Sequence, residues 1–316
     1  MDYINSINGF IAQQTGITAT LINLVIIFAK VFIVFFVAIM HMAYATYFER
    51  KTIGHMQVRL GPMRVGPHGI LQPFADVLKL MFKEDIIPAN SDKTIFYLSP
   101  IIPIIATISS FSVIPFFKDF AVANINIGLL YLFAMSSLGA YGLIMSGWSS
   151  NSKYSFLGGL RASSQVISYE IAMGLSLVGV VMMAGSLNLS DIVKAQQAYP
   201  LKVFIIPQIL GFVVFLIAAY AETNRTPFDL PEAESELVAG HFTEYSGMRF
   251  TLFFISEYMG MLIMSLVFAV CYLGGWNGPF DVPFLPFFWL LLKVYAFMFL
   301  YYWVRATVPR YRYDQL

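Results

Sequence analysis

The chain is poor in cysteine and in charge, and each shortage excludes a class of protein. Cys271 is the only cysteine among 316 residues. A disulfide within the chain is therefore excluded, as is an iron–sulfur cluster or thiolate zinc site built by this chain alone, because such sites need several thiolates. Only 12% of the residues are charged, whereas 58% are hydrophobic and 16% aromatic. So few charges cannot cover a soluble domain of this length, and the composition predicts an integral membrane protein.

Other absences narrow the functional classes. The formal net charge of +1 gives no electrostatic basis for binding nucleic acid. No Walker loop, dinucleotide fingerprint, nucleophile elbow or HExxH helix occurs, and the four histidines lack metal-ligand spacing. We therefore expect no metal or redox cofactor on this chain. The first residues, "MDYINSINGF", lack a basic region and a cleavage site, so the first apolar stretch is expected to be a retained helix rather than a signal peptide.

Seven apolar stretches are long enough to cross a hydrocarbon core of about 30 Å. Each must be helical in lipid, because its backbone groups find no water to bond. The stretches cover residues 20–48, 95–117, 127–148, 156–187, 203–221, 250–273 and 284–304. Pro100, Pro103 and Pro115 predict kinks in the second. The chain is thus predicted to be an all-α polytopic membrane protein, a single integral membrane domain over residues 1–316.

The positions of lysine and arginine predict the orientation in the membrane. Fourteen of the 19 lie in or beside the first, third and fifth connections and in the C-terminal tail. Only Lys118, Lys194 and Lys202 lie in the connections on the other side. Because loops rich in these residues stay in the cytoplasm, we expect the N-terminus outside and cytoplasmic loops over residues 49–93 and 222–249.

The first of these loops contains a predicted amphipathic helix. Two Gly-Pro steps, at positions 61 and 66, predict rigid turns. Apolar residues then recur at helical spacing over residues 70–82, with Asp76 and Lys79 on the other face. A helix of this length cannot span the bilayer and should lie at its surface. Two roles remain open for it, an anchor for the loop or a wall of a cavity that admits a lipid-like substrate.

The second loop is unusually acidic. Its stretch "AETNRTPFDLPEAESE" places five carboxylates and one arginine in sixteen positions. A plain solvated loop would explain this if Pro231 began a helix whose dipole favoured the nearby acids. Against that interpretation, Glu232 and Glu236 lie four positions apart, where like charges repel on a helix. The stretch also holds apolar residues, Phe228 and Leu230.

Two further acids lie within apolar spans. Glu170 is in "SQVISYEIAMG" and Glu257 is in "FFISEYMGM". A carboxylate at mid-bilayer costs at least about 2.5 kcal/mol and marks a path for protons or ions. We therefore predict a line of acids from the loop toward the membrane centre. Lys293, in the last span, is expected to be either a charge relay or the partner of a buried acid.

Four segments together resemble one known family, the H subunit of NADH–quinone oxidoreductase (complex I), equivalent to mitochondrial NADH dehydrogenase subunit 1. These segments are "ERKTIGHMQVRLGPMRVGPHGILQPFADVLKL", "ASSQVISYE", "AETNRTPFDLPEAESELVAGHFTEYSGMRF" and "RATVPRYRYDQL". The resemblance implies a membrane component that supplies a tunnel for quinone, the substrate, and begins an acidic path coupling quinone reduction to proton pumping. NADH, FMN and iron–sulfur clusters would be bound by partner subunits, and no cofactor by this chain.

The resemblance also implies partners and a location. The partners would be the peripheral subunits that bind the quinone headgroup, the adjacent small membrane subunits, and the lipid bilayer. The membrane would be the bacterial inner (plasma) membrane, or the mitochondrial inner membrane in a eukaryote. The family pattern continues past "RYDQL" into an eighth membrane helix, which these 316 residues do not include.

Residue roles are carried over from the family motifs, and no residue is expected to be catalytic. The quinone-binding set would line the entrance or shape the inner cavity: Glu49, Arg50, Arg59, Asp76, Lys79, Arg225 and Asp229. The proton-coupling set would form the acidic path: Glu170, Glu222, Glu232, Glu234, Glu236, Glu257 and the adjoining Tyr258.

Two alternative functions belong to other classes. The homologous membrane subunit of an energy-converting hydrogenase shares the family but uses no quinone, and the amphipathic helix and acidic loop argue against it. A stand-alone cation/proton antiporter would use Glu170 and Glu257. We find no internal repeat of the kind many transporters show, and the large cytoplasmic loops favour docking to other subunits.

Overall fold

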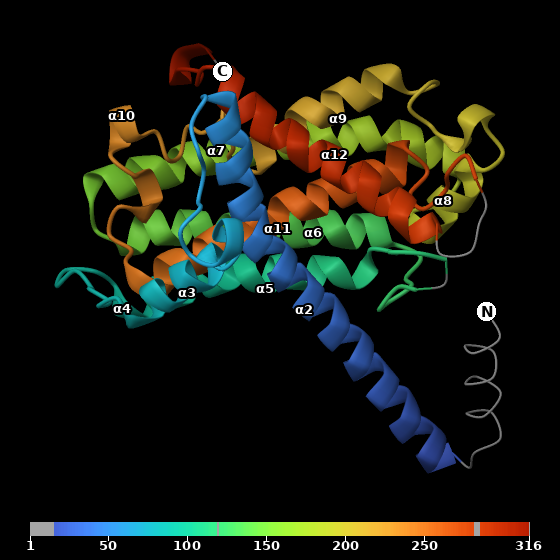
Figure 1. The fold of residues 1–316 in the computed structure, drawn as a ribbon, viewed down its shortest axis with the longest axis horizontal. Helices are drawn as coiled ribbons and strands as arrows, with labels where there is room; N and C mark the ends of the chain where they lie inside the picture. The colour runs from blue at the N-terminus through green and yellow to red at the C-terminus, as the bar shows by residue number, and fades with distance from the viewer. Residues whose placement is uncertain (1–15, 119, 281–284, 316) are drawn as a thin grey trace.

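The computed structural model describes residues 16–118, 120–280 and 285–315, and in these ranges it is helical with no β-strand. The predicted all-α class is thereby confirmed. The helices are α2 (Gly16–Met56), α3 (Gln72–Phe82), α4 (Lys93–Leu98), α5 (Ile101–Ser110), α6 (Gly128–Ser149), α7 (Lys153–Ala184), α8 (Leu189–Gln196), α9 (Ile209–Glu222), α10 (Glu234–Leu237), α11 (Gly247–Tyr272) and α12 (Leu285–Thr307). The long helices other than α2 run roughly parallel in one bundle, which α2 crosses at a steep angle (Figure 1).

Six of the described segments are long and apolar enough to span a membrane. The fifth expected span, 203–221, forms a helix only from Ile209, and its 14 residues rise about 21 Å. The preceding residues are not helical because the N–H groups of Phe204 and Ile205 donate to the carbonyl of Tyr272, at 3.0 and 3.1 Å. The end of α11 thus fixes where α9 begins.

Proline and lysine shape two connections. The second span is interrupted between α4 and α5 at Pro100, which lacks an N–H donor for a continuous helix.

Lys293 donates to the carbonyls of Leu273, Gly275 and Asn277 at 2.6, 2.8 and 2.6 Å. Backbone carbonyls, rather than a carboxylate among the described residues, therefore satisfy this ammonium, which argues against the acid-partner alternative for Lys293.

Helix α11 forms the centre of the bundle and α2 its edge. In α11, 78% of the most apolar stretch is buried, against 11% in α2. A helix buried all round belongs in a core, whereas the exposed Val25, Phe28 and Phe32 of α2 suit contact with lipid. The acid Glu257 therefore lies on the central helix, surrounded by protein.

Glycine permits the close packing that positions the acidic loop. A Cβ at Gly158 of α7 would lie 2.7 Å from the backbone nitrogen of His241 and 2.8 Å from Gly240. Small residues let backbones approach in this way in membrane proteins. The short turn Gly240–Phe242 is thereby pressed against α7, close to the start of α11.

Candidate functional site

One side chain of α7 anchors the acidic loop where it leaves α9. The Nε2 atom of Gln165 lies 2.7 Å from the carbonyl oxygens of Ala221 and Phe228 and 3.1 Å from Oδ1 of Asn224, so its two N–H groups are shared among three acceptors. These contacts from one amide hold both ends of the loop segment from Ala221 to Phe228. Arg225 lies within this segment, so Gln165 of α7 helps to fix its position.

Arg225 and Glu49 form the centre of a buried charge cluster, although 176 positions separate them. Their exposed fractions are only 6% and 3%. The Nη1 atom of Arg225 donates to Oε1 of Glu49 at 3.1 Å, and the hydroxyl of Tyr258 donates to Oε2 at 2.6 Å. Arg305, at the end of α12, also donates to Oε1 of Glu49. Both oxygens of Glu49 are therefore satisfied.

Arg225 contacts a second acid, Glu257, on the neighbouring face of α11. The Nε atom of Arg225 lies 2.6 Å from Oε1 of Glu257, a charge contact that lacks the alignment of a hydrogen bond. The guanidinium also lies over the ring of Tyr258, 4.3 Å from its centroid. Two acids and an aromatic face compensate one buried cation. We call Glu49, Arg225, Glu257, Tyr258 and Arg305 the arginine junction.

The C-terminal tail fastens the acidic loop over this junction. Arg310 pairs with Asp229 at 2.6 Å, and the backbone N–H of Tyr311 donates to the carbonyl of Pro227 at 3.1 Å. The rings of Tyr311 and Phe228 pack with centroids 5.5 Å apart. Burial raises the pKa of Asp229 above its usual range, and the charge of Arg310 opposes part of that effect.

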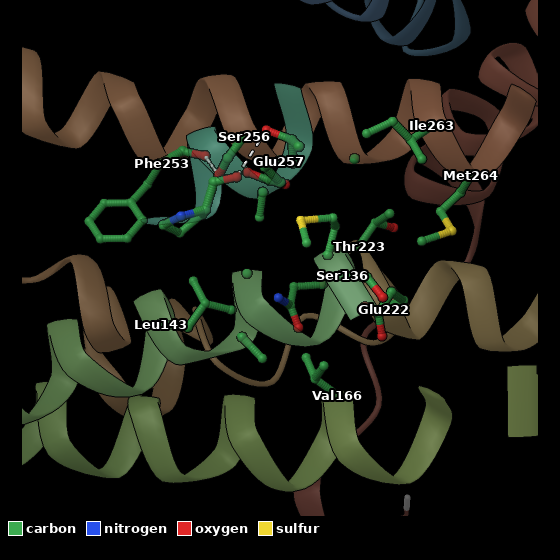
Figure 2. Close-up of a pocket in the computed structure, with 18 of the residues that line it drawn as sticks. Ser136, Leu143, Val166, Glu222, Thr223, Phe253, Ser256, Glu257, Ile263 and Met264 are labelled. Atoms are coloured by element: carbon green, nitrogen blue, oxygen red, sulfur yellow. Dashed lines mark hydrogen bonds between the residues drawn. The ribbon is translucent and has the colours of Figure 1, made fainter. Parts of the chain in front are cut away.

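A cavity of about 110 Å³ adjoins the junction. We call it the acid cavity. Its polar lining includes Ser136, Glu222, Thr223, Asn224, Glu232, His241, Ser256 and Glu257. Figure 2 shows Glu257 on the α11 side and Glu222 on the opposite side, with Val166 and Met264 among the apolar residues that complete the lining. Three of the predicted proton-coupling acids therefore face one space, and Glu257 belongs to both cavity and junction.

The surroundings of Glu232 favour its neutral form. Burial raises the pKa of Glu232 well above its usual range, and the nearby charges of Glu257 and Asp229 raise it further. A carboxyl with a raised pKa retains its proton near neutral pH and can exchange it. Such a group beside a cavity that other carboxyl groups line is suited to proton transfer.

Glu170 lies in a neighbouring apolar groove between α6 and α7, which Leu129 and Val178 help to line. Ser136 donates to Oε1 of Glu170 at 3.1 Å, and Ser137 donates to the same oxygen. Ser136 also lines the acid cavity, so Glu170 is hydrogen-bonded to a residue of the cavity wall.

The remaining acids of the loop differ from these. Glu236 is exposed at the surface and pairs with Arg161 of α7 at 2.5 Å. It lies on the outer side of the cluster and is not among the residues that line the acid cavity. The side chain of Glu234 lies outside the described part of the structure.

The first-loop residues form a separate surface group. Arg50 pairs with Asp76 of α3 at 2.7 Å, which ties the amphipathic helix to the end of α2. Arg59 is exposed and donates to Gln57 at 2.7 Å, and Lys79 is exposed on α3. The structure therefore separates the predicted quinone set into these outer residues, the buried Glu49 and Arg225, and the half-buried Asp229.

Sequence reasoning misses several members of the site. In the sequence Arg305 and Arg310 are only cytoplasmic charges, yet they pair with Glu49 and Asp229. His241 has no metal-ligand spacing and carries no other local signal. The tail segment "RATVPRYRYDQL" is a usable signal, because three arginines in a chain with an acid-rich loop are candidates for its counter-charges.

Comparison with known proteins identifies the family. The NADH dehydrogenase family model matches residues 28–316. The H subunit of NADH-quinone oxidoreductase from Paramagnetospirillum magneticum is 50% identical over 297 residues, 93% of this chain and 86% of the relative. The corresponding protein of Rickettsia typhi is 51% identical over 299 residues (93% and 87%), and that of Rhodospirillum rubrum 53% over 280 residues (87% and 82%). The chain, with its acidic loop folded onto a polytopic helical bundle, therefore belongs to the family of NADH-quinone oxidoreductase H subunits.

Proposed function

We propose that this chain couples quinone reduction to proton translocation by linking a quinone tunnel to an acidic path. One observation carries the proposal: Arg225 contacts Glu49 and Glu257 at the same time. Glu49 lies toward the end of α2, near the surface group on α3, whereas Glu257 faces the acid cavity. A single guanidinium thus joins the predicted quinone side to the predicted proton side.

Electrostatics supplies the coupling. Reduction of quinone adds negative charge, which attracts the permanently charged guanidinium of Arg225. Any movement of that charge away from Glu257 leaves the carboxylate less compensated, so it binds a proton from the acid cavity. Return of the guanidinium releases the proton. The burial of Arg225 and Glu49 strengthens these interactions compared with water.

The quinone entrance is proposed at α3. Its large apolar side chains Phe74, Leu78, Met81 and Phe82 are exposed in the isolated chain, as expected for a helix at the membrane surface. The Arg50–Asp76 pair holds this helix beside the end of α2 that carries Glu49. Arg59 and Lys79, on the exposed side of the same loop, would brace the entrance.

The assembly and orientation complete the proposal. The chain would contact peripheral subunits that bind the quinone headgroup and small membrane subunits beside the bundle. Its N-terminus would lie outside the inner (plasma) membrane, with the acidic loop in the cytoplasm. The hydrogenase and antiporter alternatives are disfavoured, because the relatives named above are subunits of NADH-quinone oxidoreductase.

The test uses Arg225→Ala in the purified complex. We expect quinone reduction by NADH to fall by about two orders of magnitude, because a positioned charge is lost. NADH oxidation by a water-soluble acceptor should remain, since it uses the peripheral arm. Arg312→Ala is the matched control, because Arg312 is exposed and pairs locally with Asp314. Wild-type quinone reduction in Arg225→Ala, with an intact complex on a native gel, would contradict the proposal.

A further inference from the structure

His241 is a buried imidazole at the loop end of the acid cavity. Its exposed fraction is 1%. Its backbone is pressed against Gly158 of α7, and its ring contacts those of Phe242 and Phe253, with centroids 3.9 and 5.8 Å away. Packing from the neighbouring loop residue, α7 and α11 therefore fixes the ring.

Neither ring nitrogen of His241 has a hydrogen-bond partner in the described part of the protein. A neutral imidazole carries one donor and one acceptor, and an unmet polar atom bears the full cost of leaving water. Buried polar atoms almost always find a partner in a protein group or an ordered water. Packing alone does not explain a histidine here, because phenylalanine would fill the same aromatic surroundings without that cost.

The acid cavity provides the missing partner. His241 lines it together with hydroxyl, amide and carboxyl groups from α6, α9, α11 and the acidic loop. A water needs roughly 10–15 Å³ and two to four polar partners, so a cavity of about 110 Å³ has room for several. Two carboxyl oxygens on its walls, Oε2 of Glu222 and Oε2 of Glu257, are likewise buried and without a partner among the described residues.

We propose that His241 is a positioning residue that holds an ordered chain of waters in the acid cavity, through which the acids exchange protons. The effect of these waters on proton pumping rests on the proposed function, whereas the water site itself follows from the geometry of the cavity alone. Burial lowers the pKa of His241 to about 3, so the ring stays neutral at physiological pH and keeps one donor and one acceptor for water. Its role is to order the chain and not to store charge.

The test compares two substitutions in the assembled complex reconstituted into vesicles. His241→Phe keeps an aromatic ring and removes both hydrogen-bonding atoms, whereas His241→Gln provides a donor and an acceptor. We expect His241→Phe to lower the protons pumped per NADH oxidised to less than half, with oxidation by a water-soluble acceptor unchanged. His241→Gln should recover most of the pumping, which a purely structural role of the ring would not produce.

Three outcomes overturn the inference. The first is wild-type pumping in His241→Phe, and the second is equal loss in His241→Gln and His241→Phe. If the variants fail to assemble, a cryo-electron density map of the wild-type complex provides the test. The third outcome that overturns the inference is a map with no water within hydrogen-bond distance of either ring nitrogen of His241. Glu257→Gln separates the two proposals: pumping lost there but kept in His241→Phe refutes only the water chain, whereas pumping kept in Glu257→Gln refutes the proposed function.

Discussion

The arginine junction and the acid cavity lie side by side, and the carboxyl groups of Glu49 and Glu222 differ in how their oxygens are satisfied. In the junction, both oxygens of Glu49 receive donors from Arg225, Arg305 and Tyr258. In the cavity, one oxygen of Glu222 and both nitrogens of His241 have no partner among the described residues. A paired cluster holds one geometry, whereas unpaired groups around a cavity remain available to water and protons.

Glu257 shows why the two regions must adjoin. Its Oε1 atom lies against Arg225, while its Oε2 atom is without a described partner and the side chain lines the cavity. Breaking a buried ion pair costs far more than breaking an exposed one, because it leaves an uncompensated charge. If the proposed function holds, the junction would supply the electrostatic force and the cavity the protons, so changes in each region should have distinct effects.

The largest effect is expected from removing the charge at the centre of the junction. Arg225→Ala should destabilise the subunit by about 3–5 kcal/mol, because Glu257 loses its buried cation. Adding Glu257→Gln should recover part of that loss, since the remaining side chain is then neutral. Thermal unfolding of the purified complex measures both variants. Equal stability of the single and double variants would show that the two side chains are not coupled.

A functional contrast follows from the two acids of the junction. Glu257→Gln should abolish most proton pumping while quinone still binds, because only its cavity side exchanges protons. Glu49→Gln should impair quinone reduction first, since Glu49 is satisfied within the junction and is not among the residues that line the cavity. Initial rates and pumping in vesicles measure both. Identical profiles for the two variants would remove the distinction between junction and cavity.

Glu232 should give the cavity a dependence on pH. Because its folded pKa is raised, the folded state keeps a proton that the unfolded chain loses above about pH 4.3. Its contribution to stability is therefore complete at low pH and is lost as pH rises toward the folded pKa. Glu232→Gln cannot lose a proton, so its unfolding temperature should fall less than that of the wild type as pH rises above the unfolded pKa of about 4.3 toward the raised folded pKa. Parallel curves would contradict the raised pKa.

The smallest effect is expected at the surface. The Arg50–Asp76 pair resembles the junction in chemistry but is exposed, with 54% of the Arg50 side chain accessible. Exposed pairs contribute about 0–1 kcal/mol, so Arg50→Ala should change the unfolding temperature by only a few degrees at most. A loss as large as that of Arg225→Ala would mean that burial does not explain the difference between the two pairs.

Much of the fold was predictable from the sequence because hydropathy acts locally. The apolar stretches, the interruption at Pro100 and the amphipathic helix over residues 70–82 all correspond to described elements. The prediction was less accurate at residues 203–208, where the backbone bonds to Tyr272 instead of forming a helix. The start of α9 therefore depends on the carbonyl of Tyr272, which is far along the chain at the end of α11. The local sequence around residues 203–208 gives no sign of this contact.

The site was predictable in its residues but not in its grouping. The sequence by itself determined a membrane protein with acids in one loop and in two spans, because the cost of placing charge in lipid can be judged residue by residue. Only the tertiary structure decided that four residues from separate segments meet, namely Glu49, Arg225, Glu257 and Arg305. The contact between Glu49 and Arg305 joins residues 256 positions apart in the sequence. The reason is physical: burial and pairing are properties of neighbours in space, and they alone separate an acid held by arginines from one left facing a cavity.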